Sequence, residues 1–181
     1  MKELSLNILD IIENSLKANA KNIELNILED DNKDLLLIEV RDDGVGMDET
    51  LLKEVFDPFT TTSKNKKVGL GLPLLKLEAE SCDGGISIES EKGKGTTVKI
   101  CFRKSHIDTP PLGDIASTIV SVVATHPEIN FRYRHEVNGK VFEISIEDLK
   151  KICNETICTP LVLNGIRDFL NEQIKSLHGG A

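Results

Sequence analysis

Polar side chains and glycine turns occur in four short segments of this sequence: Asn14, Asp42-Asp43-Gly44-Val45-Gly46, Gly69-Leu70-Gly71-Leu72 and Gly93-Lys94-Gly95-Thr96. A carboxylate on a tight glycine turn can accept a hydrogen bond from an adenine amine, and an amide oxygen suits a hard cation such as Mg²⁺. Glycines at a helix start expose backbone N–H groups that can bind phosphate. Each segment alone would predict only a turn. In this order, the segments predict a nucleotide pocket in which the helix amide is placed for a metal ion.

The first of these residues lies on an amphipathic helix that we predict over residues 3–18. Asp10, Asn14 and Lys17 lie within about 60° of one another on its polar face. The opposite face carries apolar side chains at helical spacing, namely Leu4, Ile8, Ile11, Ile12 and Leu16. A solvated polar face would show the same periodicity, so the spacing by itself leaves both interpretations open.

Short strands and amphipathic helices alternate through the first part of the chain. Strands are predicted over 23–28, 35–41, 86–91 and 96–102, and helices over 48–56 and 70–82. The elements lie too close together for full βαβ crossovers. Residues 1–104 are therefore predicted to form an α+β fold, a two-layer α/β sandwich whose mixed, mainly antiparallel sheet carries helices on one face.

The pattern changes at the stiff segment Thr109-Pro110-Pro111, which predicts a domain boundary. Residues 105–181 would then form a small C-terminal α/β appendage. Its expected elements are a helix over 112–125, hairpin strands over 130–137 and 141–146, and helices over 147–153 and 161–177. Asn138-Gly139 favours a type I′ turn between the two hairpin strands. No motif in this appendage indicates a chemistry.

The ordered motifs resemble the ATP-binding domain of the GHKL superfamily, which includes gyrases, heat-shock chaperones, mismatch-repair clamps and histidine kinases. The resemblance covers roughly residues 1–103 and implies a Bergerat-type ATP-binding fold. Its boxes are similar to the segments Asp10–Ala18 (N-box), Val40–Met47 (G1), Val55–Thr62 (F-box), Gly69–Leu72 (G2) and Glu91–Thr97 (last glycine box). The F-box, which other branches lack, places the chain nearest the histidine kinases.

The resemblance also implies roles for individual residues. Asn14 would be the Mg²⁺ ligand, Lys17 would contact the phosphates, and Asp42 would accept the adenine amine. The hydrolysing members carry a glutamate four residues before that asparagine, and this chain has Asp10 there. Glu13 is a second candidate base. Because Asp is one methylene shorter than Glu, we expect poor activation of water.

The candidate ATP lid is the basic loop from Ser63 to Val68. Its few apolar anchors and like charges predict that residues 60–68 are mobile until phosphates neutralise the lysines. The full set of nucleotide-binding residues that the resemblance implies is Asn14, Lys17, Asp42, Gly44, Gly46, Met47, Thr61, Lys64, Lys67, Gly69, Leu70, Gly71, Leu72 and Thr96.

Composition excludes several other classes of protein. The formal net charge of −8 argues against nucleic-acid binding, which needs a basic face. No apolar run approaches the roughly 20 residues of a membrane span, and the N-terminus does not read as a signal peptide. The four cysteines show no CxxC pattern, which predicts reduced thiols in a cytoplasmic protein.

These observations predict a histidine-kinase-like protein that transfers the ATP γ-phosphate to a partner in signal transduction. The nucleotide segment begins at residue 1, and no histidine lies mid-helix in a His-Glu pair, so we expect the phosphoacceptor on a separate protein. Two alternatives stay open, a standalone serine/threonine kinase of the anti-sigma-factor type and a non-catalytic ATP-gated binding module. The sequence also leaves homo-oligomerisation open.

Overall fold

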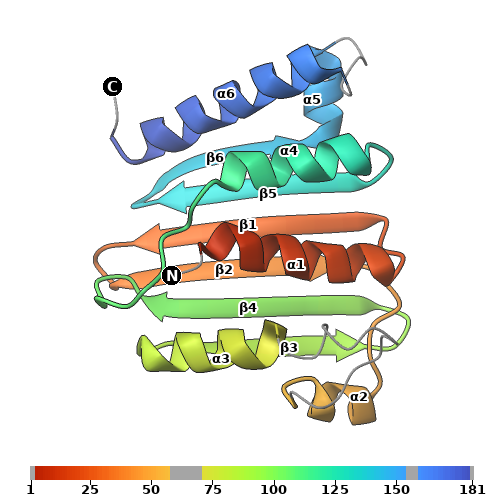
Figure 1. The fold of residues 1–181 in the computed structure, drawn as a ribbon, viewed down its shortest axis with the longest axis vertical. Coiled ribbons are helices and arrows are strands. Elements are labelled where there is room, and N and C mark those ends of the chain that lie inside the picture. Colours follow the sequence, from red (N-terminus) through yellow and green to blue (C-terminus); the bar gives the residue numbers. More distant parts are fainter. Residues whose placement is uncertain (1–2, 58–70, 154–158, 180–181) are drawn as a thin grey trace.

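The computed structural model describes residues 3–57, 71–153 and 159–179. These residues form one six-stranded sheet with helices packed on one face (Figure 1). The strands are β1 (Asn22–Asp30), β2 (Leu35–Asp42), β3 (Gly85–Glu91), β4 (Gly95–Arg103), β5 (Asn130–Val137) and β6 (Lys140–Ser145). The helices are α1 (Leu4–Lys17), α2 (Glu49–Glu54), α3 (Gly71–Ser81), α4 (Ile115–Thr125), α5 (Ile146–Ile152) and α6 (Pro160–Leu177).

The strands follow the order β3-β4-β2-β1-β5-β6 across the sheet. β1 and β5 are parallel, and the other neighbouring pairs are antiparallel. The mixed, mainly antiparallel sheet and the two-layer α+β architecture confirm the predicted fold class. Among the described residues, no helix combines the length and the apolar composition needed to cross a membrane.

Alternation along β1 shows how the layers are held together. Its side chains alternate between buried and partly exposed positions, as expected for a strand with one face under helices. The buried set, which includes Ile23, Leu25 and Ile27, packs into the same hydrophobic core as Ile8 and Ile12 of α1. Burial of this apolar surface is the main favourable contribution to folding, and it sets α1 across the middle of the sheet.

The second segment of the chain joins this sheet. β5 pairs with β1 along its whole length, from Asn22–Asn130 to Glu29–Val137, and Phe131 and Leu170 are buried in the common core. The predicted boundary after residue 104 falls in the connection between β4 and α4. The division into segments 1–104 and 105–181 stays a prediction about independent folding, because a shared sheet shows only how the two segments pack in the whole chain.

The start of α4 differs from its prediction. The helix begins at Ile115, three residues after Leu112. Gly113 has a φ of +78°, and the Asp114 side chain accepts a hydrogen bond from the Ser117 backbone N–H, which caps the helix at that point. The Leu112 carbonyl instead accepts a hydrogen bond from the backbone N–H of Ser5, one of the free donors at the start of α1.

Candidate functional site

Asp42, the last residue of β2, is the centre of the candidate site. Its Oδ2 accepts a hydrogen bond of 2.6 Å from the Ser15 hydroxyl of α1, and its Oδ1 accepts one of 2.9 Å from the Gly44 backbone N–H. These two bonds hold the carboxylate in one orientation. A carboxylate offers about four lone-pair sites, so half-buried Asp42 retains acceptor capacity for an amine of a bound base.

The turn after Asp42 is packed too closely for side chains. Gly44 is buried, and a Cβ at this position would lie 2.8 Å from the Ala18 carbonyl oxygen. Gly46 has a φ of +69°, and a Cβ there would overlap the Glu91 backbone oxygen. The Val45 N–H also donates to Ala18 O at 2.9 Å. The glycine turn is therefore clamped between the end of α1 and the β3–β4 hairpin.

Thr96 reaches the same place from β4. It is the cross-strand partner of Asp42, and its hydroxyl lies 2.8 Å from the Ser90 hydroxyl. Ser90 also accepts a hydrogen bond of 2.8 Å from the Met47 N–H. Gly95 has a φ of +117°, and a Cβ there would overlap the Asp42 carbonyl oxygen. The structure thus brings together Asp42, Gly44, Gly46, Met47 and Thr96, and their roles in nucleotide binding stay predictions.

Asp43 plays a different part from its neighbour. Its carboxylate accepts hydrogen bonds from the Lys21 and Asn22 backbone N–H groups at 2.8 and 2.9 Å, and from the Asn22 side chain at 2.6 Å. Desolvation opposes ionisation of this group, but the hydrogen bonds from Asn22 and Lys21 outweigh it and lower the pKa of Asp43. Asp43 therefore anchors the glycine turn to the start of β1.

α1 contacts Asp42 through Ser15, which lies on the buried side of the helix. Asp10, Glu13, Asn14 and Lys17 are all exposed, and their side chains make no hydrogen bond or ion pair with the part of the chain that the structure describes. Asn14 is the neighbour of Ser15 in the sequence of this helix. The roles predicted for these four side chains stay predictions.

The start of α3 completes the described part of the site. α3 lies beside α1 on the same face of the sheet (Figure 1). Its first residue, Gly71, is exposed, and a Cβ there would meet no atom of the described residues within 4 Å. Leu72 is half-buried against the core. The predicted contacts and lid at Thr61, Ser63 to Val68 (with Lys64 and Lys67), Gly69 and Leu70 lie outside the described residues.

Two polar residues that the sequence reasoning missed organise this site. Ser15 lies on the buried face of α1 with Ile8, Ile11 and Ile12. A polar side chain on an apolar stripe needs a hydrogen-bond partner, and that interruption was the available signal. Ser90 connects Met47 to Thr96, and nothing in the short β3 pattern distinguishes it from any exposed strand serine.

Comparisons with known proteins agree with this geometry. Residues 2–106 match the family described as "Histidine kinase-, DNA gyrase B-, and HSP90-like ATPase". Sporulation kinase C of Bacillus subtilis (strain 168) is 36% identical over 92 residues, which are 51% of this chain and 21% of that protein. Sensor histidine kinase YxdK of the same strain is 32% identical over 108 residues, 56% of this chain and 33% of that protein.

A solved structure is also similar to this chain. The N-terminal domain of a DNA repair protein has a TM-score of 0.59 at 15% identity, and the match covers 84% of this chain and 57% of that chain. At this identity the similarity concerns the fold alone. The aligned share includes part of the segment after residue 106.

Proposed function

Since this chain belongs to the histidine kinase-, DNA gyrase B- and HSP90-like ATPase family, we propose that it binds ATP with Mg²⁺ and transfers the γ-phosphate to a separate protein in signal transduction. The observation that carries the proposal is the Asp42 carboxylate, fixed by Ser15 of α1 and by Gly44 at the end of β2. The chain spans about a fifth to a third of the length of the kinases described above. Phosphoryl transfer by this chain is therefore a proposal, because the similarity covers only part of those proteins.

Asp42 supports selectivity for adenine. An ionised carboxylate accepts hydrogen bonds only, so it favours an exocyclic amine over the carbonyl that guanine presents at the corresponding position. A hydrogen bond to a charged group contributes about 1.5–3 kcal/mol. The hydroxyl of Thr96, directly across from Asp42, supplies a further polar contact at the base.

Asn14 and Lys17 fit the phosphate end of the same ligand. Both are exposed on α1, and Asn14 offers the neutral oxygen that Mg²⁺ accepts while it keeps several waters. Bound Mg²⁺ would neutralise charge on the transferring phosphoryl group. Lys17 would add a positive charge, and the start of α3 at Gly71 would present backbone N–H groups.

Phosphoryl transfer to a partner is favoured over hydrolysis, because neither candidate base is well placed to activate water. Asp10 has a shorter reach than the glutamate of hydrolysing members, and Glu13 points about 60° away from it around α1. Phosphoryl transfer depends mostly on positioning and on neutralisation of charge, which Asn14-bound Mg²⁺ and Lys17 can supply. An incoming acceptor then needs only to enter beside the γ-phosphate.

The four histidines support an acceptor on another protein. His106 lies in a turn, His126 and His178 follow the last residues of α4 and α6, and His135 is fully buried in β5. None occupies the exposed middle of a helix, where the phosphoacceptor of a histidine kinase would be expected. The acceptor on the partner is therefore a histidine, or a serine or threonine in the alternative kinase class.

The direct test combines this chain, γ-radiolabelled ATP and Mg²⁺ with each protein that co-purifies with it. We expect the chain itself to stay essentially unlabelled and one partner to carry the label, acid-labile on histidine or acid-stable on serine or threonine. Rapid hydrolysis without a partner, abolished in Asp10→Asn, would instead favour an ATPase. Tight ATP binding with neither transfer nor hydrolysis would leave the ATP-gated binding module.

A further inference from the structure

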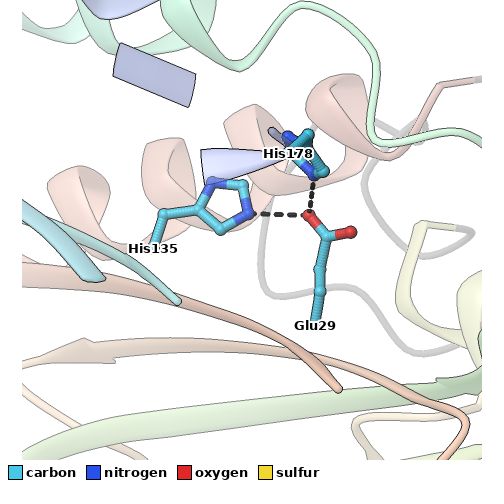
Figure 2. Close-up of side chains that lie close together, drawn as sticks. All are labelled: Glu29, His135 and His178. Atoms are coloured by element: carbon cyan, nitrogen blue, oxygen red, sulfur yellow. Dashed lines mark hydrogen bonds and ion pairs between the residues drawn. The ribbon is translucent and has the colours of Figure 1, made fainter. Parts of the chain in front are cut away.

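A second cluster of ionisable side chains lies at the opposite end of the sheet from Asp42. It consists of Glu29 on β1, His135 on β5 and His178 at the end of α6 (Figure 2). Glu29 is six positions from Ile23, the cross-strand partner of Asp42, which places the two sites roughly 20 Å apart. The cluster is therefore separate from the nucleotide site.

Both imidazole rings are directed at one carboxylate oxygen. His135 Nε2 lies 2.8 Å and His178 Nε2 lies 2.9 Å from Glu29 Oε1 (Figure 2). The three atoms lie within 4.8 Å of one another, so a single ion could contact all three. His135 is fully buried and Glu29 nearly so. Buried polar groups packed this closely are costly unless each polar atom has a hydrogen-bond or ionic partner.

The second nitrogen of His178 decides what its Nε2 can do. Nδ1 lies 2.9 Å from the carbonyl oxygen of Ile174, which only accepts hydrogen bonds, so Nδ1 carries the proton. In a neutral ring, Nε2 then has a lone pair that faces an ionised carboxylate oxygen. Two acceptors at this distance require a cation between them, either a second proton on the ring or a metal ion.

The surroundings resemble those of metal-binding histidines and carboxylates. The Tyr133 hydroxyl lies 2.7 Å from His135 Nδ1 and can accept a hydrogen bond from the Nδ1–H group. In this neutral tautomer of His135, Nε2 carries a lone pair and can act as a ligand. Lys104 Nζ lies 3.3 Å from Glu29 Oε2, so Oε1 alone remains available. Such outer contacts typically orient metal ligands.

We propose that Glu29 Oε1, His135 Nε2 and His178 Nε2 bind a divalent transition-metal ion, with Zn²⁺ as the best match to two imidazoles and one carboxylate. The fourth position would be taken by water from an adjoining cavity of about 390 Å³, lined by Thr109, Pro111 and Ile174 among others. The same set of donors would disfavour Mg²⁺, which prefers oxygen ligands.

The geometry needs only a small adjustment. Ligands about 2.0–2.1 Å from a tetrahedral ion lie about 3.3 Å apart, so the two distances from Nε2 to Glu29 Oε1 would lengthen by about half an ångström. His178 can move because it follows the last residue of α6 and its side chain is 40% exposed. A bound ion would join β1 of the nucleotide segment to β5 and to the end of α6, and would thereby stabilise the docking of the C-terminal helix.

The experiment uses the whole chain and Zn²⁺, with excess Mg²⁺ present to occupy sites built from oxygen ligands. After equilibrium dialysis, metal analysis should find about one zinc per chain, and zinc should raise the melting temperature. His178→Gln should weaken zinc binding at least tenfold and remove the rise in melting temperature. Because His178 is partly exposed, this variant should fold. The matched control is His126→Gln, which removes a half-buried histidine whose side chain pairs only with Glu128 and should behave as the unmodified chain.

A second readout distinguishes this site from the cysteines. The thiols of Cys82 and Cys101, which form no disulfide among the described residues, could retain zinc unspecifically. Co²⁺ at the proposed site should give the visible absorption of a tetrahedral ion with nitrogen and oxygen ligands and no thiolate charge-transfer band, and Glu29→Gln should abolish it. The proposal would be overturned if no zinc bound, if His178→Gln retained as much zinc as the unmodified chain, or if a thiolate band appeared. The cluster would then be an ion pair in which a protonated imidazole donates to Glu29.

Discussion

The Ser15 hydroxyl donates a 2.6 Å hydrogen bond to Asp42 Oδ2 and so joins α1 to the end of β2. This contact fixes the Asp42 carboxylate against the helix that carries Asn14. It also explains why a serine occupies the buried face of α1. The nucleotide site thus depends on a contact between a helix and a strand that are 27 residues apart.

Ser15→Ala should weaken ATP binding. Loss of a hydrogen bond to a charged group costs about 1.5–3 kcal/mol, which corresponds to a roughly tenfold to hundredfold higher Kd if the carboxylate loses its orientation. Calorimetric titration with Mg-ATP measures this change. Ser81→Ala is the control, because the Ser81 hydroxyl bonds only within its own helix and to Cys82. Unchanged affinity in Ser15→Ala would show that the contact does not position Asp42.

Gly95→Ala should destabilise the chain more than Gly93→Ala. Both glycines have positive φ, +117° and +86°, but only a Cβ at Gly95 would overlap the Asp42 backbone, whereas one at Gly93 meets nothing within 4 Å. Alanine at Gly93 should cost about 1 kcal/mol from backbone strain, and at Gly95 several kcal/mol. Urea unfolding measures both. Equal losses would mean that the hairpin does not pack on Asp42 as described.

Leu170→Ala should lower the stability of the whole chain. Leu170 of α6 is fully buried in the core that both segments share, and such truncations cost about 2–5 kcal/mol. Leu161, at the exposed start of the same helix, is the matched control and should change little. A urea transition that stays single for far-UV and near-UV signals would show that β5 and α6 unfold with β1. Loss of the C-terminal helix alone, in an earlier transition, would contradict a common core.

Asn14→Asp should change the use of metal more than the fold. The side chain is exposed, so stability should change by no more than about 0.5 kcal/mol. An added carboxylate beside the phosphates should alter the Mg²⁺ concentration that supports ATP binding, because charge and ligand type both change at the ion. Asn171→Asp, exposed on α6, adds the same charge elsewhere. If ATP binding by the two variants depended on the Mg²⁺ concentration in the same way, Asn14 would not be a metal ligand.

Local patterns were sufficient to predict much of the fold. The β5–β6 turn forms at Asn138-Gly139 with φ values of 48° and 88°, as the type I′ turn requires, because few other residues adopt two successive positive φ angles. Asp48 caps α2 through the Leu51 N–H as expected. In each case the determining chemistry lies within a few residues in the sequence.

Long-range contacts were not accessible in the same way. The parallel pairing of β5 with β1 cannot be predicted from the sequence of either strand. In both strands, buried and exposed side chains alternate as in any strand with one face covered. The Ser15–Asp42 contact and the Glu29–His135–His178 cluster join residues 27, 106 and 149 positions apart. Such contacts arise from packing of whole elements, so the sequence placed Asp42 and Thr96 in one site through motifs, whereas Ser15 and Ser90 emerged only from the structure.

The most direct test of the account is calorimetric titration of the chain with Mg-ATP and with Mg-GTP, and of Asp42→Asn with both. We predict that ATP binds at least tenfold more tightly than GTP, because the fixed carboxylate of Asp42 accepts from the adenine amine, and that Asp42→Asn removes most of this preference while the fold stays intact. Equal affinity of the unmodified chain for ATP and GTP would contradict the central claim.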